Sequence, residues 1–341
     1  MWLGRARKNN TIVIAASAIG MMAAYAVAVK TPSFAGRVLP QETSKRMEVM
    51  QVAALKEIVR AVNAGDAKKY AIVYGPDAVI KIYGGEELKG RDAIEKYEVD
   101  LLRQFPGTQI AFETVWQKDL VVVVHYAVNG QTPGGQAMGH EGLLFYQFQA
   151  SGLIAEERRY LDSLTPMGQL GALGKVPVRR PPTLRTEMEV HLAKDSSEEK
   201  KNIVTARASL AALDTKNEAV FFEHMTEDAI VDDLIYPQPF AGRQELKAWF
   251  ETEAAAVHAQ GEITSILGAG DFVLVETILR GSLKGALGPV LAPQPPKEFA
   301  VHRAAILQLR NSKIARISFF MNGKELAEAV GEWPLAVMTS H

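Results

Sequence analysis

The 341-residue sequence contains no cysteine. Disulfide bonds, thiolate metal sites, cysteine nucleophiles and a lipid-modified cysteine are therefore excluded. An excess of one charge is also absent, since 38 Lys and Arg stand against 39 Asp and Glu. With no long basic stretch either, we expect no nucleic-acid partner. No cofactor or metal motif is present, so we expect no cofactor and no bound metal. What remains is ordinary globular composition, 48% hydrophobic and 23% charged.

The N-terminal segment differs from the rest of the chain. It opens with basic residues, namely Arg5, Arg7 and Lys8. An uncharged, largely apolar run follows from 11 to 29, which is just long enough to span a bilayer. Ser33-Phe34-Ala35 before Gly36 would also suit a signal peptidase, and so would Ala26-Val27-Ala28. We therefore expect residues 1–36 to be a membrane anchor or a cleaved signal peptide. The protein would then be anchored in the inner membrane facing the periplasm, or periplasmic or secreted after cleavage.

The remainder contains two copies of one unit. Three landmarks recur at an offset of about 152 residues: 76–80 with 227–231, 89–97 with 241–249, and 119–123 with 271–275. Between the copies, residues 174–197 are rich in proline and charge and are typical of a solvated linker. The sequence therefore predicts a first domain at 44–173 and a second at 198–333.

Each copy begins with helices and continues with strands, an order that favours an α+β fold. In the first copy we expect helices at 47–63 and 92–105, a short strand at 77–83, and antiparallel strands at 110–118, 120–129, 142–150 and 153–161. Val121 to Val124 is apolar on both faces, so we expect that strand to be covered on both sides. The second copy can supply the cover, giving a pseudo-dimer within one chain. A further dimer stays possible.

Both copies show a recurring set of motifs. The first has Gly152-Leu153-Ile154, Tyr160-Leu161-Asp162 and Gln169-Leu170-Gly171; the second has Ser312-Lys313-Ile314, Phe320-Met321-Asn322 and Val330-Gly331. A glycine-rich stretch also runs from Gly281 to Gly288. This pattern resembles the SnoaL-like branch of the nuclear transport factor two superfamily, which includes polyketide cyclases and ketosteroid isomerases. The resemblance implies two cystatin-like cones, each a curled antiparallel sheet packed on helices.

The second copy offers one candidate catalytic residue. Asp228 to Asp233, followed by Gly242, resembles the first-strand region of ketosteroid isomerases, and this implies that Asp233 abstracts a proton next to a carbonyl. Tyr236 and Trp249 would line the same cone, where partial burial strengthens a carboxylate as a base. The oxyanion donors of those isomerases are missing, since Ser209 and Ala305 stand at their positions, and His302, a few residues away, is the candidate for a substitute donor.

The first copy has no acid at the corresponding position, which falls at about Ile82. Its candidate ligand-binding residues are Tyr83, Tyr97, Trp116, His125 and His140. The sequence hence favours binding of a small apolar molecule in a cone pocket without catalysis. One alternative is a cofactor-free isomerase, cyclase or dehydratase that uses Asp233 as its general base. The other is a structural scaffold whose cones are filled.

Overall fold

The computed structural model describes residues 41–173, 177–288, 290 and 295–331. The predicted anchor or signal segment at 1–36 lies outside the described residues. Among the residues that are described, no helix is long and apolar enough to cross a membrane. Both repeats belong to one compact unit.

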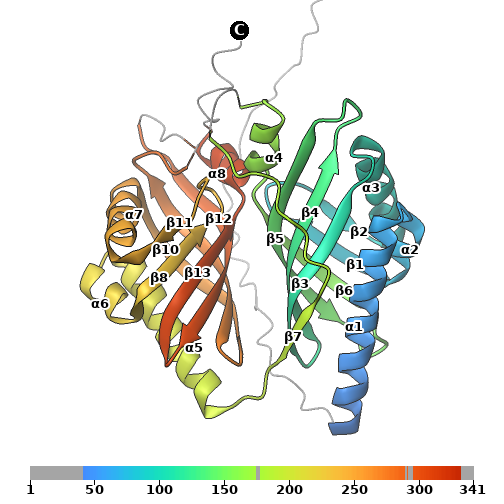
Figure 1. The fold of residues 1–341 in the computed structure, drawn as a ribbon, viewed down its shortest axis with the longest axis horizontal. Helices are drawn as coiled ribbons and strands as arrows, with labels where there is room; N and C mark the ends of the chain where they lie inside the picture. Colours follow the sequence, from blue (N-terminus) through green and yellow to red (C-terminus); the bar gives the residue numbers. More distant parts are fainter. Residues whose placement is uncertain (1–40, 174–176, 289, 291–294, 332–341) are drawn as a thin grey trace, which may run out of the picture. The chain divides into compact units, whose positions relative to one another are not determined.

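The first repeat folds as helices packed on one face of a sheet (Figure 1). Its elements are α1 (Gln41–Asn63), α2 (Ala67–Ile72), β1 (Tyr74–Ile82), β2 (Glu87–Lys89), α3 (Arg91–Gln104), β3 (Gln109–Lys118), β4 (Val121–Gln131), β5 (Ala137–Phe148), β6 (Ile154–Leu161) and α4 (Leu164–Gln169). The strands join in the order β2-β1-β6-β5-β4-β3-β7.

The second repeat has the same plan. Strand β7 (Glu189–Leu192) precedes it, followed by α5 (Ser197–Asp214), α6 (Glu218–Glu223), β8 (Met225–Asp233), β9 (Phe240–Ala241), α7 (Gly242–Ala256), β10 (Val257–Ala269), β11 (Phe272–Leu283), β12 (Glu298–Arg310), β13 (Lys313–Met321) and α8 (Gly323–Val330). Its sheet has the order β10-β11-β12-β13-β8-β9. The predicted α+β fold of two cones is therefore confirmed.

Two features of the sheets differ from the prediction. Strands β1 and β8 pair parallel with β6 and β13, whereas an entirely antiparallel sheet was predicted. Only strands joined by a hairpin are forced to be antiparallel, and these partners are far apart in the sequence. Strand β7, in the predicted linker, adds to the sheet edge by parallel pairing of Val190 with Val115. Part of the predicted linker at 174–197 therefore belongs to the first sheet. An edge strand is held by backbone hydrogen bonds and needs little apolar side-chain area, so the composition did not reveal it.

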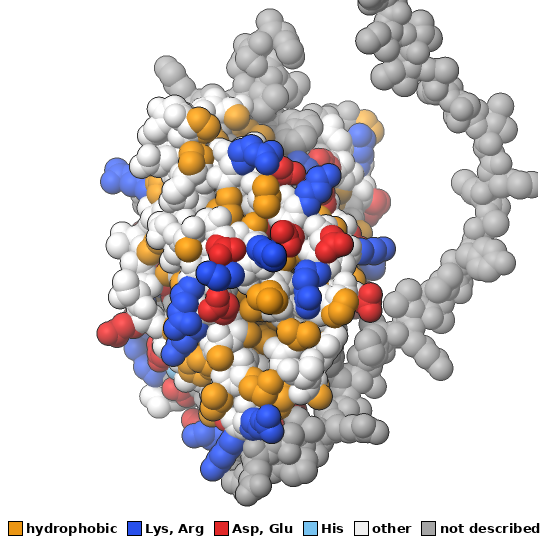
Figure 2. Space-filling model, turned by 90° about the vertical axis from the view of Figure 1, so that its right-hand side faces the viewer, with side chains coloured by type: hydrophobic (Ala, Val, Ile, Leu, Met, Phe, Trp, Pro, Cys, Tyr) orange, Lys and Arg blue, Asp and Glu red, His pale blue; other side chains and the backbone are white. Residues whose placement is uncertain are grey.

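The helices of the first repeat face the sheet with one apolar side. Leu55, Ile58 and Val62 of α1 recur at helical spacing and are buried in the core. Figure 2 views the molecule from the side on which these helices lie in Figure 1, and there charges of both signs intermingle. Exposed ion pairs such as Arg60–Glu57 contribute little to the free energy of folding. The helices are therefore held mainly by their inner face, which also borders the cone interior.

The two sheets pack against each other through their outer faces. One apolar cluster combines residues of both repeats: Trp116, Val123, Leu143, Phe145 and Tyr160 of the first, and Leu234, Leu267, Leu274, Ile306 and Phe320 of the second. In β4, Val122 and Val124 point into the cone while Val123 points to the other repeat, and all three are fully buried. This explains why the strand is apolar on both faces.

The contact between the repeats is nearly twofold symmetric. Asp162 and Asn322 follow β6 and β13, and each accepts hydrogen bonds at the start of its own helix, α4 or α8. Each also reaches across: Asp162 Oδ1 accepts from the Gly323 amide and Asn322 Oδ1 from the Ser163 amide, both at 3.2 Å. Such reciprocal contacts are typical of a symmetric dimer.

Candidate functional site

The cone of the first repeat encloses a cavity of about 280 Å³. Helices α1, α2 and α3, the concave face of the sheet and α4 all contribute to its wall. Much of the lining is apolar, including Ile58, Val62, Leu101, Phe112, Val128 and Leu144. The volume is close to the lower end of the range of about 300–1,000 Å³ found for small-molecule pockets.

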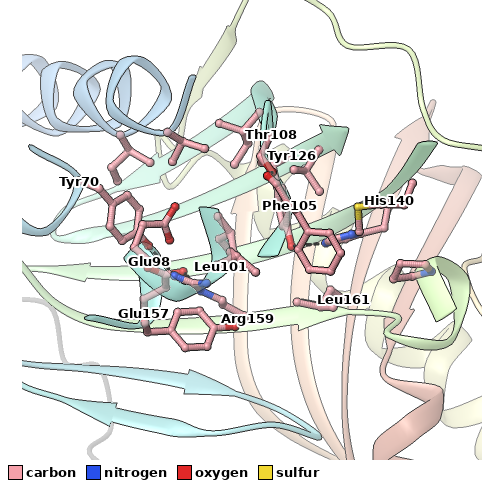
Figure 3. Close-up of a pocket in the computed structure, with 18 of the residues that line it drawn as sticks. Tyr70, Glu98, Leu101, Phe105, Thr108, Tyr126, His140, Glu157, Arg159 and Leu161 are labelled. Atoms are coloured by element: carbon pink, nitrogen blue, oxygen red, sulfur yellow. Dashed lines mark hydrogen bonds and ion pairs between the residues drawn. The ribbon is translucent and has the colours of Figure 1, made fainter. Parts of the chain in front are cut away.

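Local structure determines which side chains enter the cavity. On α3, Ile94, Tyr97, Glu98 and Leu101 follow the spacing of one helix face, and the last three line the cavity. On β6, alternate residues point the same way, so Glu157, Arg159 and Leu161 face the cone. Figure 3 shows Glu98, Glu157 and Arg159 together on one side of the cavity, and His140 on the other.

A closed polar network holds Arg159 in place. Its Nε donates to one oxygen of Glu157, and its Nη2 donates to the Tyr70 hydroxyl. The Tyr74 hydroxyl donates to the other oxygen of Glu157 and lies 2.8 Å from that of Tyr70. Burial disfavours a charged guanidinium, but the Glu157 carboxylate and the surrounding tyrosines together outweigh this and raise the pKa of Arg159. Glu157 and Arg159 are thus a compensated ion pair.

Glu98 has no comparable partner. Its side chain is only 3% exposed, and within the described residues its carboxyl group accepts no hydrogen bond. Burial raises the pKa of Glu98 to about 7, although the Arg159 charge acts in the opposite direction. Near neutral pH this carboxyl group is thus close to half protonated, and it lies in the wall of the cavity.

His140 lies at the other end of the cavity. Its Nε2 is 3.2 Å from the Tyr126 hydroxyl, while its Nδ1 is buried and has no hydrogen-bond partner among the described residues. Burial lowers the pKa of His140 to about 4, so the ring is neutral at pH 7. A neutral ring can exchange a hydrogen bond with a ligand but supplies no charge.

The second cone has a different polar set. The Tyr236 hydroxyl donates to Glu253 at 2.6 Å, and one oxygen of Asp233 accepts from the Ile235 amide at 3.3 Å. Burial raises the pKa of Asp233 to about 6. Burial, followed by the Asp233 charge, raises that of Glu253 to about 8. The predicted base is therefore buried beside a second carboxyl group and can hold a proton near pH 6.

Aromatic rings occupy much of the second cone. Glu157 pairs with Ile80 in the first sheet, and Ile317 pairs with Val231 in the second. Ile80 and Val231 are equivalent in the repeat, so Ile317 stands at the position of Glu157. By the same register, Phe319 replaces Arg159. The Phe319 ring stacks on that of Trp249, with centroids 6.1 Å apart. At these two positions the second cone therefore has apolar side chains where the first has an ion pair.

The predicted site residues fall into three places. Tyr97 and His140 line the cavity of the first cone. Asp233, Tyr236 and Trp249 lie in the second cone. The other four lie outside both cones, where the repeats meet: Tyr83 stacks on His302 at 3.8 Å, Trp116 packs on Phe272, and His125 packs on Phe320. Placing these four in a cone was wrong. Both faces of each sheet are covered, so an aromatic residue on a strand does not reveal which face it is on.

His140 and His302 stand at similar places in the two copies, but they are not equivalent. Gly142 faces Leu161 across the β5–β6 pair, and Arg303 faces Met321 across the β12–β13 pair. His302 is therefore equivalent to Glu141, one residue from His140. A shift of one residue reverses the face of a strand, and His302 accordingly pairs with Glu325 at 2.7 Å instead of entering a cone.

All three charged residues of the first cavity, Glu98, Glu157 and Arg159, were missed, as were most of its other lining residues, Tyr126 among them. Glu156 to Arg159 reads as a solvated strand edge, but β6 is central, between β1 and β5. Opposite charges two residues apart on one strand lie on the same face, and this spacing was the available signal. Glu157 and Arg159 pair inside the cone, while Arg158 reaches Glu276 of the other repeat.

The part of the chain that the structure describes contains no group of three or more His, Asp or Glu side chains that could hold a metal ion.

Comparison with known proteins supports the fold. The model of the SnoaL-like domain matches twice, at residues 55–157 and 206–317, more than half of the chain in total. No curated protein matches significantly.

Several solved structures are similar. A Catenulispora acidiphila protein of ketosteroid isomerase-like fold, in complex with trimethylamine, is 24% identical, covering 38% of this chain and 93% of its own, with a TM-score of 0.33. A putative SnoaL-like polyketide cyclase from Jannaschia is 17% identical over 41% and 99%, with a TM-score of 0.36. A Mycobacterium tuberculosis protein in complex with estradiol-17beta-hemisuccinate is 18% identical over 33% and 95%, with a TM-score of 0.31. The two matched regions of the domain model show that this chain belongs to the SnoaL-like domain family and carries two copies in tandem.

Proposed function

We propose that the protein binds a small, largely apolar molecule in the cone of the first repeat, without catalysis. One observation carries this proposal, the enclosed and mainly apolar cavity of about 280 Å³ with a few polar groups at its ends. Cavities of this composition bind by burying apolar ligand surface, and their polar groups orient the ligand.

The test is to fill the cavity from α3. Leu101 lines the cavity, whereas Val99 on the same helix is 38% exposed. Isothermal titration of the full-length protein with 2-naphthol and 2-tetralone gives the reference affinities. Leu101→Trp should weaken binding by roughly tenfold or more, because the new ring occupies the ligand's place. Val99→Trp adds the same ring outside the cavity and should leave binding unchanged.

Equal effects of the two substitutions would count against the first cone. Absence of binding to wild type would favour the structural scaffold, in which neither cone takes a ligand.

A second candidate function is favoured by Asp233. A buried carboxyl group with a pKa of about 6 is suited to take a proton from carbon next to a carbonyl. In this alternative the second cone is an isomerase, cyclase or dehydratase site. Exchange of α-hydrogens of 2-tetralone for deuterium, followed by NMR, tests it directly. Catalysed exchange should be lost in Asp233→Asn and retained in Glu245→Gln, which changes another acid of the same repeat. If wild type gives no exchange above buffer, this alternative fails.

We further propose export, from the basic start and the apolar run at 11–29. An alkaline phosphatase fusion after residue 41, expressed in a Gram-negative bacterium, should be active only if the segment carries it out of the cytoplasm. Fractionation and N-terminal sequencing then separate an anchored chain from a cleaved one.

A further inference from the structure

The charges in the wall of the first cavity are unbalanced. Two carboxyl groups, Glu98 and Glu157, and one guanidinium, Arg159, line it. Arg159 and a tyrosine use both oxygens of Glu157. Within the described residues nothing donates a hydrogen bond to Glu98, which projects from a different element, α3. An ionised Glu98 thus leaves the wall one negative charge in excess.

A buried carboxylate without a partner is costly, and a ligand that supplies a cation removes that cost. Arg159 does not repel such a ligand strongly, because Glu157 already neutralises its charge at the contact. The cavity can therefore accept one positive charge beside Glu98.

Aromatic rings surround the same space. The lining includes Tyr70, Tyr97, Phe105, Tyr126 and Tyr146. The face of an aromatic ring carries partial negative charge and attracts a cation within about 6 Å. Aliphatic side chains complete the wall, so a hydrocarbon group is also accommodated.

We propose that the first cone binds a lipophilic amine, whose ammonium group pairs with the Glu98 carboxylate while its hydrocarbon part fills the apolar remainder. This inference rests on the proposed ligand-binding function of the first cone and specifies its ligand class. The occupant that competes with it is a neutral alcohol or ketone, which would bond to a protonated Glu98.

Amines and alcohols of the same skeleton separate the two classes. The probes are 2-phenylethylamine, hexylamine and 1-aminoadamantane, each titrated beside its alcohol into the full-length protein. Wild type should bind at least one amine roughly tenfold more tightly than the matching alcohol, as a charge-assisted hydrogen bond provides. Glu98→Gln should abolish this preference and leave the affinity for the alcohol unchanged.

Asp100→Asn is the control, since it removes a negative charge from an exposed position of the same helix. It should leave the preference intact. Glu98→Met, which is apolar and of similar length, serves as a second variant, and thermal unfolding confirms that each variant folds.

The possible failures are distinguishable. If Glu98→Gln keeps the preference for the amine, or wild type binds the alcohol as tightly, the amine inference is wrong. If Leu101→Trp still abolishes alcohol binding in that case, the proposed function of the first cone stands. If neither class binds to wild type, both proposals are wrong.

Discussion

Arg158 of the first repeat and Glu276 of the second form a bidentate ion pair, in which Nε and Nη2 donate to the two carboxylate oxygens at 2.7 and 2.9 Å. Glu276 is only 3% exposed, and the Tyr160 hydroxyl also donates to it at 2.8 Å. The ion pair thus joins the two sheets at a largely buried position.

Removal of Arg158 alone should destabilise the protein more than replacement of Arg158, Glu276 and Tyr160 together. Arg158→Ala leaves Glu276 buried without its counter-ion and should lower the free energy of unfolding by about 3 kcal/mol. The triple variant Arg158→Met, Glu276→Met and Tyr160→Phe should be much less destabilised, because it leaves no buried charge unpaired. Urea unfolding of the full-length protein measures both. Equal losses would mean that packing, not charge, determines the cost.

The carboxyl groups of the second cone should make stability depend on pH. Glu253 has a pKa of about 8 in the folded protein against an ordinary value of 4.5, and Asp233 about 6 against 3.8. The folded state therefore binds more protons than the unfolded state between these values. Its extra stability is fully present below about pH 4 and is lost as the pH rises towards 8.

The measurement is the melting temperature across this pH range. Glu253→Gln should flatten the decline, because an amide does not ionise. Glu245→Gln, on the same helix but exposed, should not change its slope. A decline that persists unchanged in Glu253→Gln would contradict this assignment.

The residues at Asp162 and Asn322 should be interchangeable in one direction. Oδ1 of Asp162 accepts from the Leu164 and Gly323 amides and Oδ2 from the Thr165 amide, whereas Asn322 makes the equivalent contacts at α8 with one oxygen. Asp162→Asn keeps the oxygen that faces Leu164 and Gly323 but turns an NH2 group towards the Thr165 amide, so it should lower the free energy of unfolding by only about 1 kcal/mol. Asp162→Ala removes the cap and should cost about 2 kcal/mol. Chemical denaturation of both variants checks this, and similar losses would contradict the capping role.

A swap between repeats should close the first cavity. Ile317 and Phe319 occupy in the second cone the positions of Glu157 and Arg159. The double variant Glu157→Ile and Arg159→Phe should lose ligand binding yet stay folded, because replacement of a complete buried ion pair by apolar groups is often neutral. Calorimetric titration with 2-naphthol and circular dichroism report on the two effects separately. Retained binding would show that the ligand lies elsewhere.

The repeat made much of the fold predictable. The Gly-Arg pairs at Gly90 and Gly242, which lie in the recurring segments 89–97 and 241–249, stand at the start of α3 and α7. The helices and strands expected in the first copy lie within a few residues of those observed, except that α1 begins at Gln41 and β5 at Ala137, both earlier than expected. The short elements α2, β2 and α4 were not predicted. The parallel pairing of β1 with β6 was not predictable. It depends on where the chain returns after four intervening strands, which no local pattern records.

The site was less predictable for a physical reason. Tyr97 and His140 were identified as aromatic or polar residues on the right elements, yet the adjacent Glu98 was not. A charged residue on a helix is usually exposed, and only the three-dimensional enclosure of α3 buries this one. The same holds for Glu157 and Arg159, whose strand is central because β1 joins it from far away in the sequence.

Because the two faces that meet in this protein belong to one chain, they are free to differ. In a dimer of identical subunits every contact occurs twice and every mutation alters both pockets. Here Arg158–Glu276 has no twin, since Ser318 and His125 stand at the equivalent positions. A mutation in one repeat changes one cone only. Covalent fusion thus permits a division of labour, in which one half keeps a hollow interior while the other can exchange its pocket for a more densely packed support.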